Sequence, residues 1–289
     1  MTNAPLITHV SDTARWVAMY RAIESERPDA IFHDPFARRL AGARGASIAK
    51  AMDKRSRADW PMVVRTAVMD EIILRTINEQ GFTQVVNLAA GLDARPWRLA
   101  LPPTLRWVDV DHAVMLDEKE RELAAERTSC AYEGVRLDLA DVGARRTLFA
   151  RLSAEGRRTL VVAEGLLVYL TAAQVTSLAR DLATMPGFDL WLIDLASPRL
   201  LAMMQRSWGK AVTEGDAQFV FGPAEGTAFF TPLGWTEREW RGTMEEAFRL
   251  NRTFPFARVW RFVGKLMSKS RQDAFKRFSG ITLLERAVV

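Results

Sequence analysis

The sequence predicts an α/β fold with a mostly parallel sheet, and three features support this prediction. Short apolar runs, typical of buried strands, alternate with longer segments of helical periodicity. A glycine turn follows the first run, and acidic residues follow the later runs. Because alternating strands and helices form βαβ units, the strands should lie parallel in one sheet, in a Rossmann-like arrangement.

The stretch Gln84–Leu99, QVVNLAAGLDARPWRL, contains the first strand and the glycine turn. Its apolar residues form the strand, and Gly91 forms the turn, where a side chain would block the close approach of a ligand. Asp93 can cap the helix that follows, and Pro96 fits the first helical turn, where no amide donor is needed. This order of elements is typical of the entry to a nucleotide-type cofactor site.

Four more strand-like runs follow, and each leads to an acidic residue. The runs are Leu105–Val108, Val135–Leu137, Leu160–Ala163 and Leu190–Ile193, which lead to Asp111, Asp138, Glu164 and Asp194. Helices are expected at Val114–Arg127, Val142–Leu152 and Ala172–Met185, and a closing strand at Ile281–Glu285. Since ligands bind outside the carboxyl ends of parallel strands, Gly91 and the first three of these acids are predicted to lie on one edge.

Two segments fall outside this alternation. Residues 1–80 are expected to form an N-terminal helical lid, with one helix from Ser11 or Asp12 to Glu24 and another from Pro61 to Asn78. Residues 81–289 then form the main domain, in which residues 199–278 are expected to be a helical insert before the closing strand. The aromatic residues of this insert, most of them interpreted as core, are Trp208, Phe219, Phe221, Phe229, Phe230, Trp235, Trp240, Phe254, Phe256 and Trp260.

Arg65 is unusual because it falls on the apolar stripe of the predicted helix from Pro61 to Asn78. A buried guanidinium needs an anionic partner, since burying the charge alone is costly. Asp70 and Glu71 point elsewhere on the helical wheel, which indicates a partner outside this helix. That partner is either an internal carboxylate or the anionic group of a ligand.

The bulk composition is that of an ordinary folded protein, with 48% hydrophobic and 26% charged residues. The apolar runs are strand-sized, and the N-terminal sequence MTNAPLITHV lacks the pattern of a secretory signal. A cytoplasmic protein without a membrane partner is therefore expected. The single cysteine, Cys130, excludes an internal disulfide, and the three histidines, His9, His33 and His112, lack the spacing of a metal site. No bound metal is expected.

The net charge of +5 raises the question of nucleic acid as a partner. The basic residues are scattered in short pairs, with one loose cluster at Lys265–Arg277 and no interleaved aromatic stripe. They are interpreted as solvated surface, so a nucleic-acid partner is not favoured. No feature of the sequence sets an oligomeric state.

Two classes of cofactor use a glycine turn followed by a strand-end acid. A nicotinamide dinucleotide requires the pattern G-x-G-x-x-G/A, but the corresponding residues here are Ala89, Gly91 and Ala94. S-adenosylmethionine has no phosphates; it needs an acid for its ribose, a polar group near its adenine, and both a cation and an anion for its amino-acid end. The residues that suit these needs are Gly91, Asp111, Asp138, Arg65 and Glu164. They favour S-adenosylmethionine over a dinucleotide, with Asp111 as the ribose contact and the neighbouring Asp109 in a structural role.

The chain resembles the leucine carboxyl methyltransferase-like group of class I S-adenosylmethionine-dependent methyltransferases, which includes polyketide O-methyltransferase-like proteins. The resemblance runs through most of the chain, in the segments SDTARWVAMYRAIES, IFHDPFA, RTAVMDEII, NLAAGLDARPWRL, VDVDHAVMLDEK, LDL, AEGLLVYL and FFTPLGW. The glycine-turn and AEGLLVYL segments are specific together, and the others support them. The resemblance implies a mostly parallel sheet of about seven strands and S-adenosylmethionine as the cofactor.

The resemblance also implies roles for individual residues. The residues implied to contact the cofactor, from its methionine end to its adenine, are Arg65, Thr66, Glu164, Ala89, Gly91, Asp111, Asp138 and Leu139. Arg65 would bind the carboxylate, with help from Thr66, and Asp138 and Leu139 would meet the adenine. The family often has glycine at the position of Ala89. It often has threonine at the position of Ala94 and proline at the position of Ala113. Alanine is small enough at each of these positions to preserve binding of the cofactor.

The expected reaction is transfer of a methyl group to an oxygen of a small molecule, either a hydroxyl or a carboxylate, in secondary metabolism. A carboxylate is already a nucleophile, whereas a hydroxyl needs a base, and the sequence identifies no catalytic residue. Tyr20, His33 and Tyr169 are candidates for contacting the substrate, and each also fits a structural role. Two alternatives stay open: an RNA methyltransferase, and a protein that binds S-adenosylmethionine without turnover.

Overall fold

The computed structural model describes residues 10–56, 59–213, 218–254, 257 and 268–287. Three helices precede the sheet: α1 (Val10–Ser25), α2 (Ala37–Ser56) and α3 (Trp60–Gln80). The two helices expected in this region correspond to α1 and α3. The sequence positions His9, Phe256, Trp260 and Lys265, and the side chain of Trp208, lie outside the described part of the chain.

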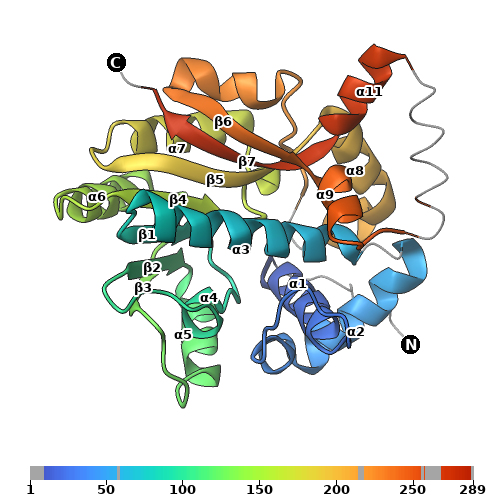
Figure 1. Ribbon diagram of the computed structural model, residues 1–289, viewed down its shortest axis with the longest axis horizontal. Coiled ribbons are helices and arrows are strands. Elements are labelled where there is room, and N and C mark those ends of the chain that lie inside the picture. The colour runs from blue at the N-terminus through green and yellow to red at the C-terminus, as the bar shows by residue number, and fades with distance from the viewer. Residues whose placement is uncertain (1–9, 57–58, 214–217, 255–256, 258–267, 288–289) are drawn as a thin grey trace.

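Seven described strands form one sheet in the order β3-β2-β1-β4-β5-β7-β6 (Figure 1). In chain order they are β1 (Gln84–Leu88), β2 (Arg106–Asp111), β3 (Ala131–Arg136), β4 (Thr159–Ala163), β5 (Phe188–Ala196), β6 (Trp235–Gly242) and β7 (Ser279–Arg286). β1 to β5 pair in parallel, and β7 runs antiparallel to both β5 and β6. The predicted, mostly parallel sheet is confirmed. Its strand order reverses between β1 and β4, which is where α/β folds place their ligands.

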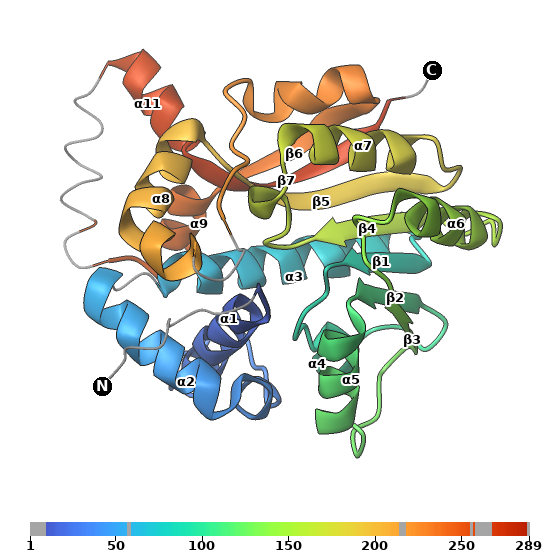
Figure 2. The ribbon, with the colours of Figure 1, turned by 180° about the vertical axis from the view of Figure 1, so that it is seen from behind.

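Helices cover both faces of the sheet. α3 crosses the face that is in front in Figure 1, together with α9 (Thr243–Arg249). It buries Val68, Ile72 and Ile73 in one core with residues of β1, β4, β5 and β7. The other face, in front in Figure 2, carries α6 (Val142–Ser153) and α7 (Ala172–Ala183), and η2 (Gly226–Leu233) packs against α7.

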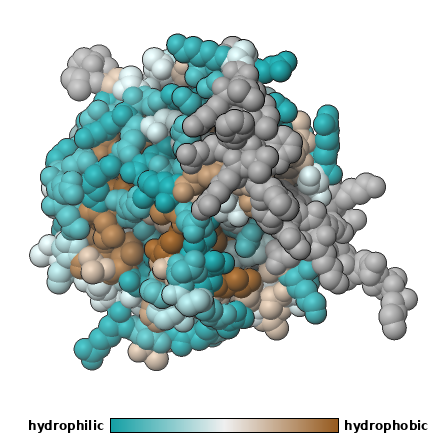
Figure 3. All heavy atoms as spheres, turned by 45° about the vertical axis from the view of Figure 1, so that its right-hand side comes forward, coloured by the Kyte–Doolittle hydropathy of each residue, from teal (hydrophilic) through white to brown (hydrophobic). Residues whose placement is uncertain are grey.

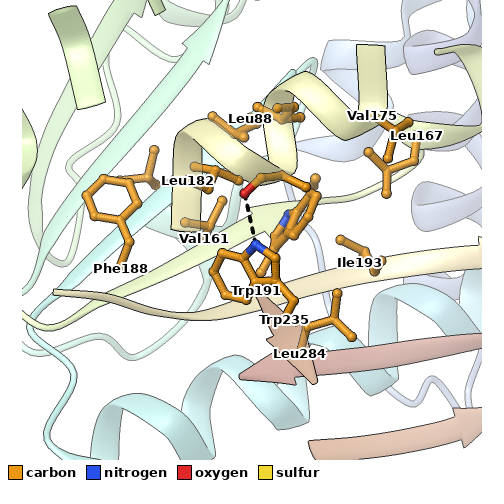
Figure 4. Packing of buried hydrophobic residues seen from close by; sticks show 14 of the residues in the cluster. Leu88, Val161, Leu167, Val175, Leu182, Phe188, Trp191, Ile193, Trp235 and Leu284 are labelled. Carbon is orange, nitrogen blue, oxygen red and sulfur yellow. Dashed lines mark hydrogen bonds between the residues drawn. The ribbon is translucent and has the colours of Figure 1, made fainter. Parts of the chain in front are cut away.

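Trp191 of β5 and Trp235 of β6 lie at the centre of this second core (Figure 4). Both side chains are fully buried, and their ring centroids are 5.5 Å apart. The indole nitrogen of Trp235 donates a hydrogen bond of 2.9 Å to the carbonyl oxygen of Ala179 on α7, the dashed line in Figure 4. The sheet edge is therefore fixed to the helical layer by a buried aromatic side chain whose polar atom is satisfied.

β6 corrects the expectation that residues 199–278 form a helical insert. Three described α-helices, α8 (Pro198–Thr213), α9 and α11 (Lys269–Lys276), and the 3-10 helix η2 do lie in this interval, but β6 lies between η2 and α9 and pairs with β7. Its sequence, WTEREWRG, is mostly charged, and the strand register shifts between Glu237 and Glu239. A charged edge strand with a bulge lacks the apolar alternation by which strands are recognised.

α1 and α2 pack mainly on each other, at the side of the sheet (Figures 1 and 2). Their shared core contains Trp16, Tyr20 and Leu40, and it extends to Leu92 in the glycine turn and to Met115. Met115 belongs to α5 (Ala113–Glu122), and the glycine turn leads into the single-turn helix α4 (Arg95–Arg98). This packing places α1 beside the carboxyl ends of β1 and β2.

Candidate functional site

A cavity of about 1340 Å³ lies at the carboxyl edge of the parallel strands. α1, the start of α3, α8 and the turns that follow β1 to β4 form its walls. Figure 3 brings this side of the molecule forward and shows apolar side chains, in brown, gathered among hydrophilic ones. The predicted site residues that line the cavity are Arg65, Ala89, Gly91, Asp111, Asp138, Leu139, Glu164 and Tyr169.

Gly91 and Asp111 join the turn after β1 to the end of β2. The Gly91 amide donates a 2.6 Å hydrogen bond to Oδ2 of Asp111, and the His112 amide donates one of 2.7 Å to Oδ1. Gly91 has a φ of +50°, and a Cβ there would lie 3.3 Å from Cβ of Ala14 on α1. A side chain at this position would therefore be strained and would crowd the helix above the turn.

Pro96 lies where the sequence predicts, but Asp93 does not cap the helix: the N-cap of α4 is Ala94, without a side-chain cap hydrogen bond. Oδ1 of Asp93 accepts a 2.9 Å hydrogen bond from the Arg95 amide, and Pro96 lies in the first turn of α4. The helix they begin ends already at Arg98.

Arg65 meets two carboxylates that come from neighbouring strands. Its Nε lies 3.0 Å from Oε1 of Glu164, directly after β4, and its Nη1 lies 3.0 Å from Oδ2 of Asp194 on β5. Both partners lie outside α3, as predicted. Although burial lowers it, the pKa of Arg65 is raised by the charges of Asp194 and Glu164, so the guanidinium stays charged.

Gly165 makes room for this arginine. Its φ is +65°, and a Cβ would lie 3.2 Å from Nη1 and 3.4 Å from Nη2 of Arg65. Its amide donates a 2.6 Å hydrogen bond to Oδ1 of Asp194, so one carboxylate orients both the turn and the guanidinium. The glycine after Glu164 is therefore required by the close approach of Arg65.

Arg95 is the residue that the sequence analysis missed. Its side chain is almost fully buried and donates to three carboxylates: Asp70 on α3 at 2.6 Å, Asp93 at 2.7 Å and Glu164 at 2.8 Å. Burial raises the pKa of Glu164, but the charges of Arg95 and Arg65 outweigh burial and lower it overall. Glu164 thus has two cationic partners, and it is ionised beside the cavity.

The end of β3 is more open. Asp138 is exposed and accepts a 2.8 Å hydrogen bond from the Ala140 amide, while the carbonyl oxygen of Leu139 accepts one of 2.8 Å from Arg145. Both residues line the cavity. A carboxylate and a turn backbone are therefore available to a ligand there.

Thr66 and two of the three substrate candidates do not line the cavity. Thr66 is buried in α3, and Tyr20 is buried in the core shared by α1 and α2, whereas His33 is exposed on the surface. Tyr169 does line the cavity, and its ring lies 5.4 Å from that of Phe219. Burial raises the pKa of Tyr169, so its hydroxyl stays protonated near neutrality.

The arrangement is suited to an uncharged nucleoside attached to an amino acid. Carboxylates lie at the ends of β2 and β3, and a guanidinium lies with carboxylates at the ends of β4 and β5.

Among the described residues, no three His, Cys, Asp or Glu side chains cluster as a metal site. None of the helices within the described ranges has both the length and the apolar character needed to cross a membrane.

A family model described as leucine carboxyl methyltransferase matches residues 14–183, which is more than half of the chain. The chain belongs to the leucine carboxyl methyltransferase family. The matched range contains most of α1, the glycine turn and Glu164, and it ends at the end of α7. The resemblance inferred from the sequence is therefore confirmed.

Relatives of this methyltransferase-family chain cover much of the same region. A protein of Parafrankia sp. is 36% identical over 203 residues, and one of Mycobacteroides abscessus is 33% identical over 198 residues. These matches cover 64% and 62% of this chain and 63% of each relative, so the chain spans less than two thirds of their length. A protein of Mycobacterium bovis is 28% identical, with 96% of this chain and 88% of the relative covered. All three are named as candidate S-adenosyl-L-methionine-dependent methyltransferases.

Two solved structures share the fold across almost the whole chain. A DUF574 family protein from Streptomyces avermitilis has a TM-score of 0.61 at 13% identity, with 98% of this chain and 99% of that chain covered. A candidate methyltransferase from Thermobifida fusca has a TM-score of 0.60 at 13% identity, with 98% and 96% covered. The likeness supports the α/β architecture of this methyltransferase-family chain.

Ala89 provides a test of the glycine turn. Its φ is +51°, a conformation that costs alanine about 1–2 kcal/mol and glycine almost nothing. Glycine loses more conformational entropy than alanine on folding, and this offsets part of the gain. Ala89→Gly should therefore raise the free energy of unfolding in urea by about 0.5–1 kcal/mol. The control is Ala90→Gly, next to it and at negative φ, which should lower that free energy by about 1 kcal/mol. A loss of stability in Ala89→Gly would contradict the described turn.

Proposed function

We propose that this chain is an S-adenosylmethionine-dependent methyltransferase that acts on an oxygen atom of a small molecule. One observation carries the proposal: Arg65, Gly91, Asp111, Asp138 and Glu164 line a single cavity, although they come from five separate parts of the chain. Membership of the leucine carboxyl methyltransferase family and the names of the relatives support the same reaction class.

The charges along the cavity suit the parts of this cofactor in order. Asp111 is fixed by two amide hydrogen bonds and still lines the cavity, so it would accept from the ribose hydroxyls. Asp138 and the backbone at Leu139 would meet the adenine. At the other end, Arg65 would hold the carboxylate and Glu164 the ammonium group, with Gly91 under the chain between them.

When bound, S-adenosylmethionine supplies a methyl group that is already activated on a sulfonium sulfur. The chain's own residues then have to bind and orient an acceptor oxygen in line with that sulfur and to exclude water. The cavity volume of about 1340 Å³ exceeds the roughly 300–1,000 Å³ of a typical site for one small molecule, so it has room for an acceptor beside the cofactor. A small-molecule hydroxyl or carboxylate is the acceptor that we propose.

Methyl transfer can be followed directly. With cofactor labelled on its methyl group, label should pass into small molecules of a bacterial extract and not into its RNA. Mild alkali separates the two acceptor types, because it hydrolyses methyl esters and leaves methyl ethers intact. Label found only in RNA, or in nothing although the cofactor binds, would overturn the proposed reaction.

The cofactor assignment predicts a specific pattern in calorimetry. S-adenosylmethionine and S-adenosylhomocysteine should bind, and NAD should not. Asp111→Ala should weaken S-adenosylhomocysteine binding by about 1.5–3 kcal/mol, because a hydrogen bond to a charged group is lost. Asp117→Ala, an exposed carboxylate on the following helix α5, is the matched control and should bind normally. Binding of NAD alone would exclude this cofactor class.

Arg65 can be tested with a cofactor analogue that lacks the carboxylate. Arg65→Ala should reduce the affinity for S-adenosylhomocysteine by about 10–100-fold, the equivalent of a charged hydrogen bond. It should reduce the affinity for decarboxylated S-adenosylhomocysteine much less. Equal losses for both ligands would mean that Arg65 only neutralises Glu164 and Asp194 and has no contact with the cofactor.

A further inference from the structure

The cavity has an apolar half whose walls the proposed cofactor contacts do not use. On this side the lining side chains include Trp16 of α1, Tyr169, Phe219, Met203 and Met204 of α8, and Phe275 of α11. The strand-end half, in contrast, is lined by the carboxylates and by Arg65. One cavity therefore joins a charged end to an apolar end.

Hydrogen bonds hold the apolar lining of the cavity in place, and this lining begins close to the carboxyl ends of the strands. Tyr169 ends η1 (Leu167–Tyr169), five positions after Glu164 in the sequence AEGLLVYL. The amides of Val220 and Phe221 donate to the carbonyl oxygen of Val168 at 2.7 and 3.1 Å. These bonds hold the segment 219–221 against η1, so Phe219 packs on Tyr169.

α8 is fixed to the same wall. The Gln205 side chain donates a 2.7 Å hydrogen bond to the carbonyl oxygen of Phe219. Met204 packs in one cluster with Trp16, Tyr169 and Phe219. The wall therefore continues from the end of β4, over η1, to the surface of α8.

Two of the apolar side chains that line the cavity are also exposed to solvent. Met203 and Phe275 line the cavity and are 48% and 54% exposed. The exposed residues near them on α8 and α11 include the charged Arg206 and Lys276. Because water disfavours such side chains, an apolar strip that continues a cavity and has a polar surround marks a place where a ligand binds.

We infer that the methyl acceptor has an extended apolar body and that Met203 and Phe275 select it by its length. This inference rests on the proposed function and names its substrate class: a molecule with one reactive oxygen near the cofactor and an alkyl, acyl or linked-ring portion that reaches α8 and α11. Two side chains at the open end of a cavity contact only acceptors long enough to reach them. Because a methionine side chain adapts its shape to its partner, the length of the acceptor's apolar portion would affect binding more than its shape.

The test uses para-ethylphenol, para-pentylphenol and para-octylphenol, titrated into the protein with and without S-adenosylhomocysteine. Each buried methylene should tighten binding about fourfold in the wild-type protein. Met203→Ser and Phe275→Ser should each reduce the gain from pentyl to octyl and leave para-ethylphenol unchanged. Val114→Ser is the matched control, because Val114 is 75% exposed and is not among the residues that line the cavity.

The outcomes separate this inference from the proposed function. Failure of S-adenosylhomocysteine to bind would overturn the cofactor assignment, while the dependence on chain length would still be measured in its absence. Equal affinity for all three phenols, or no binding of any of them, would overturn the inference. So would an unchanged gain from pentyl to octyl in both serine variants, since the long chain would then lie elsewhere.

Discussion

The site depends on one buried cation, the guanidinium of Arg95. A parallel sheet brings its strand ends to one edge, but it does not fix the turns that leave them. Arg95 does so by holding Asp70 on α3, Asp93 in the glycine turn and Glu164 after β4 with one side chain. Because a guanidinium left unpaired in this environment is costly, the three carboxylates have to stay where the arginine is. The charge balance of the interior therefore fixes the geometry of the cavity.

The same charges continue in both directions from Arg95. On one side, Glu164 leads to Arg65 and then to Asp194 on β5. On the other side, Asp70 leads to Arg98, which lies 3.8 Å from Asp34, and Asp34 accepts from Arg21 of α1 at 2.9 Å. Arg21 also donates to the carbonyl oxygen of Leu92 in the glycine turn. α1, which lines the cavity, is thus bonded to the network that holds the strand ends, and this helps to keep the helix in place over the site.

The sequence shows that a buried charge requires a partner more readily than it shows which residue the partner is. Arg65 on an apolar stripe was predicted to need an anionic partner, and it has one in Glu164, but nothing local indicated this pairing across 99 positions. Strand order decides such pairs, and it follows from the whole sheet. Arg95 was missed because its neighbours Asp93 and Pro96 suggested only a helix start. β6 was missed because only its two end residues, Trp235 and Gly242, are buried, and the residues between them are mostly charged.

Asp109 and Asp111 show how depth along one strand decides what a carboxylate can do. Two residues apart on β2, they point to the same face of the sheet. Asp109 is fully buried, and its carboxylate accepts from the buried Lys119 at 2.6 Å, from Trp107 at 2.8 Å and from Asn87 at 3.1 Å. These three donors are all groups of the protein interior, so Asp109 has a structural role beneath the turn. Asp111, one pleat nearer the edge, accepts only backbone amides and still lines the cavity. The alternation of the strand does not separate the two; the position at which the strand ends does.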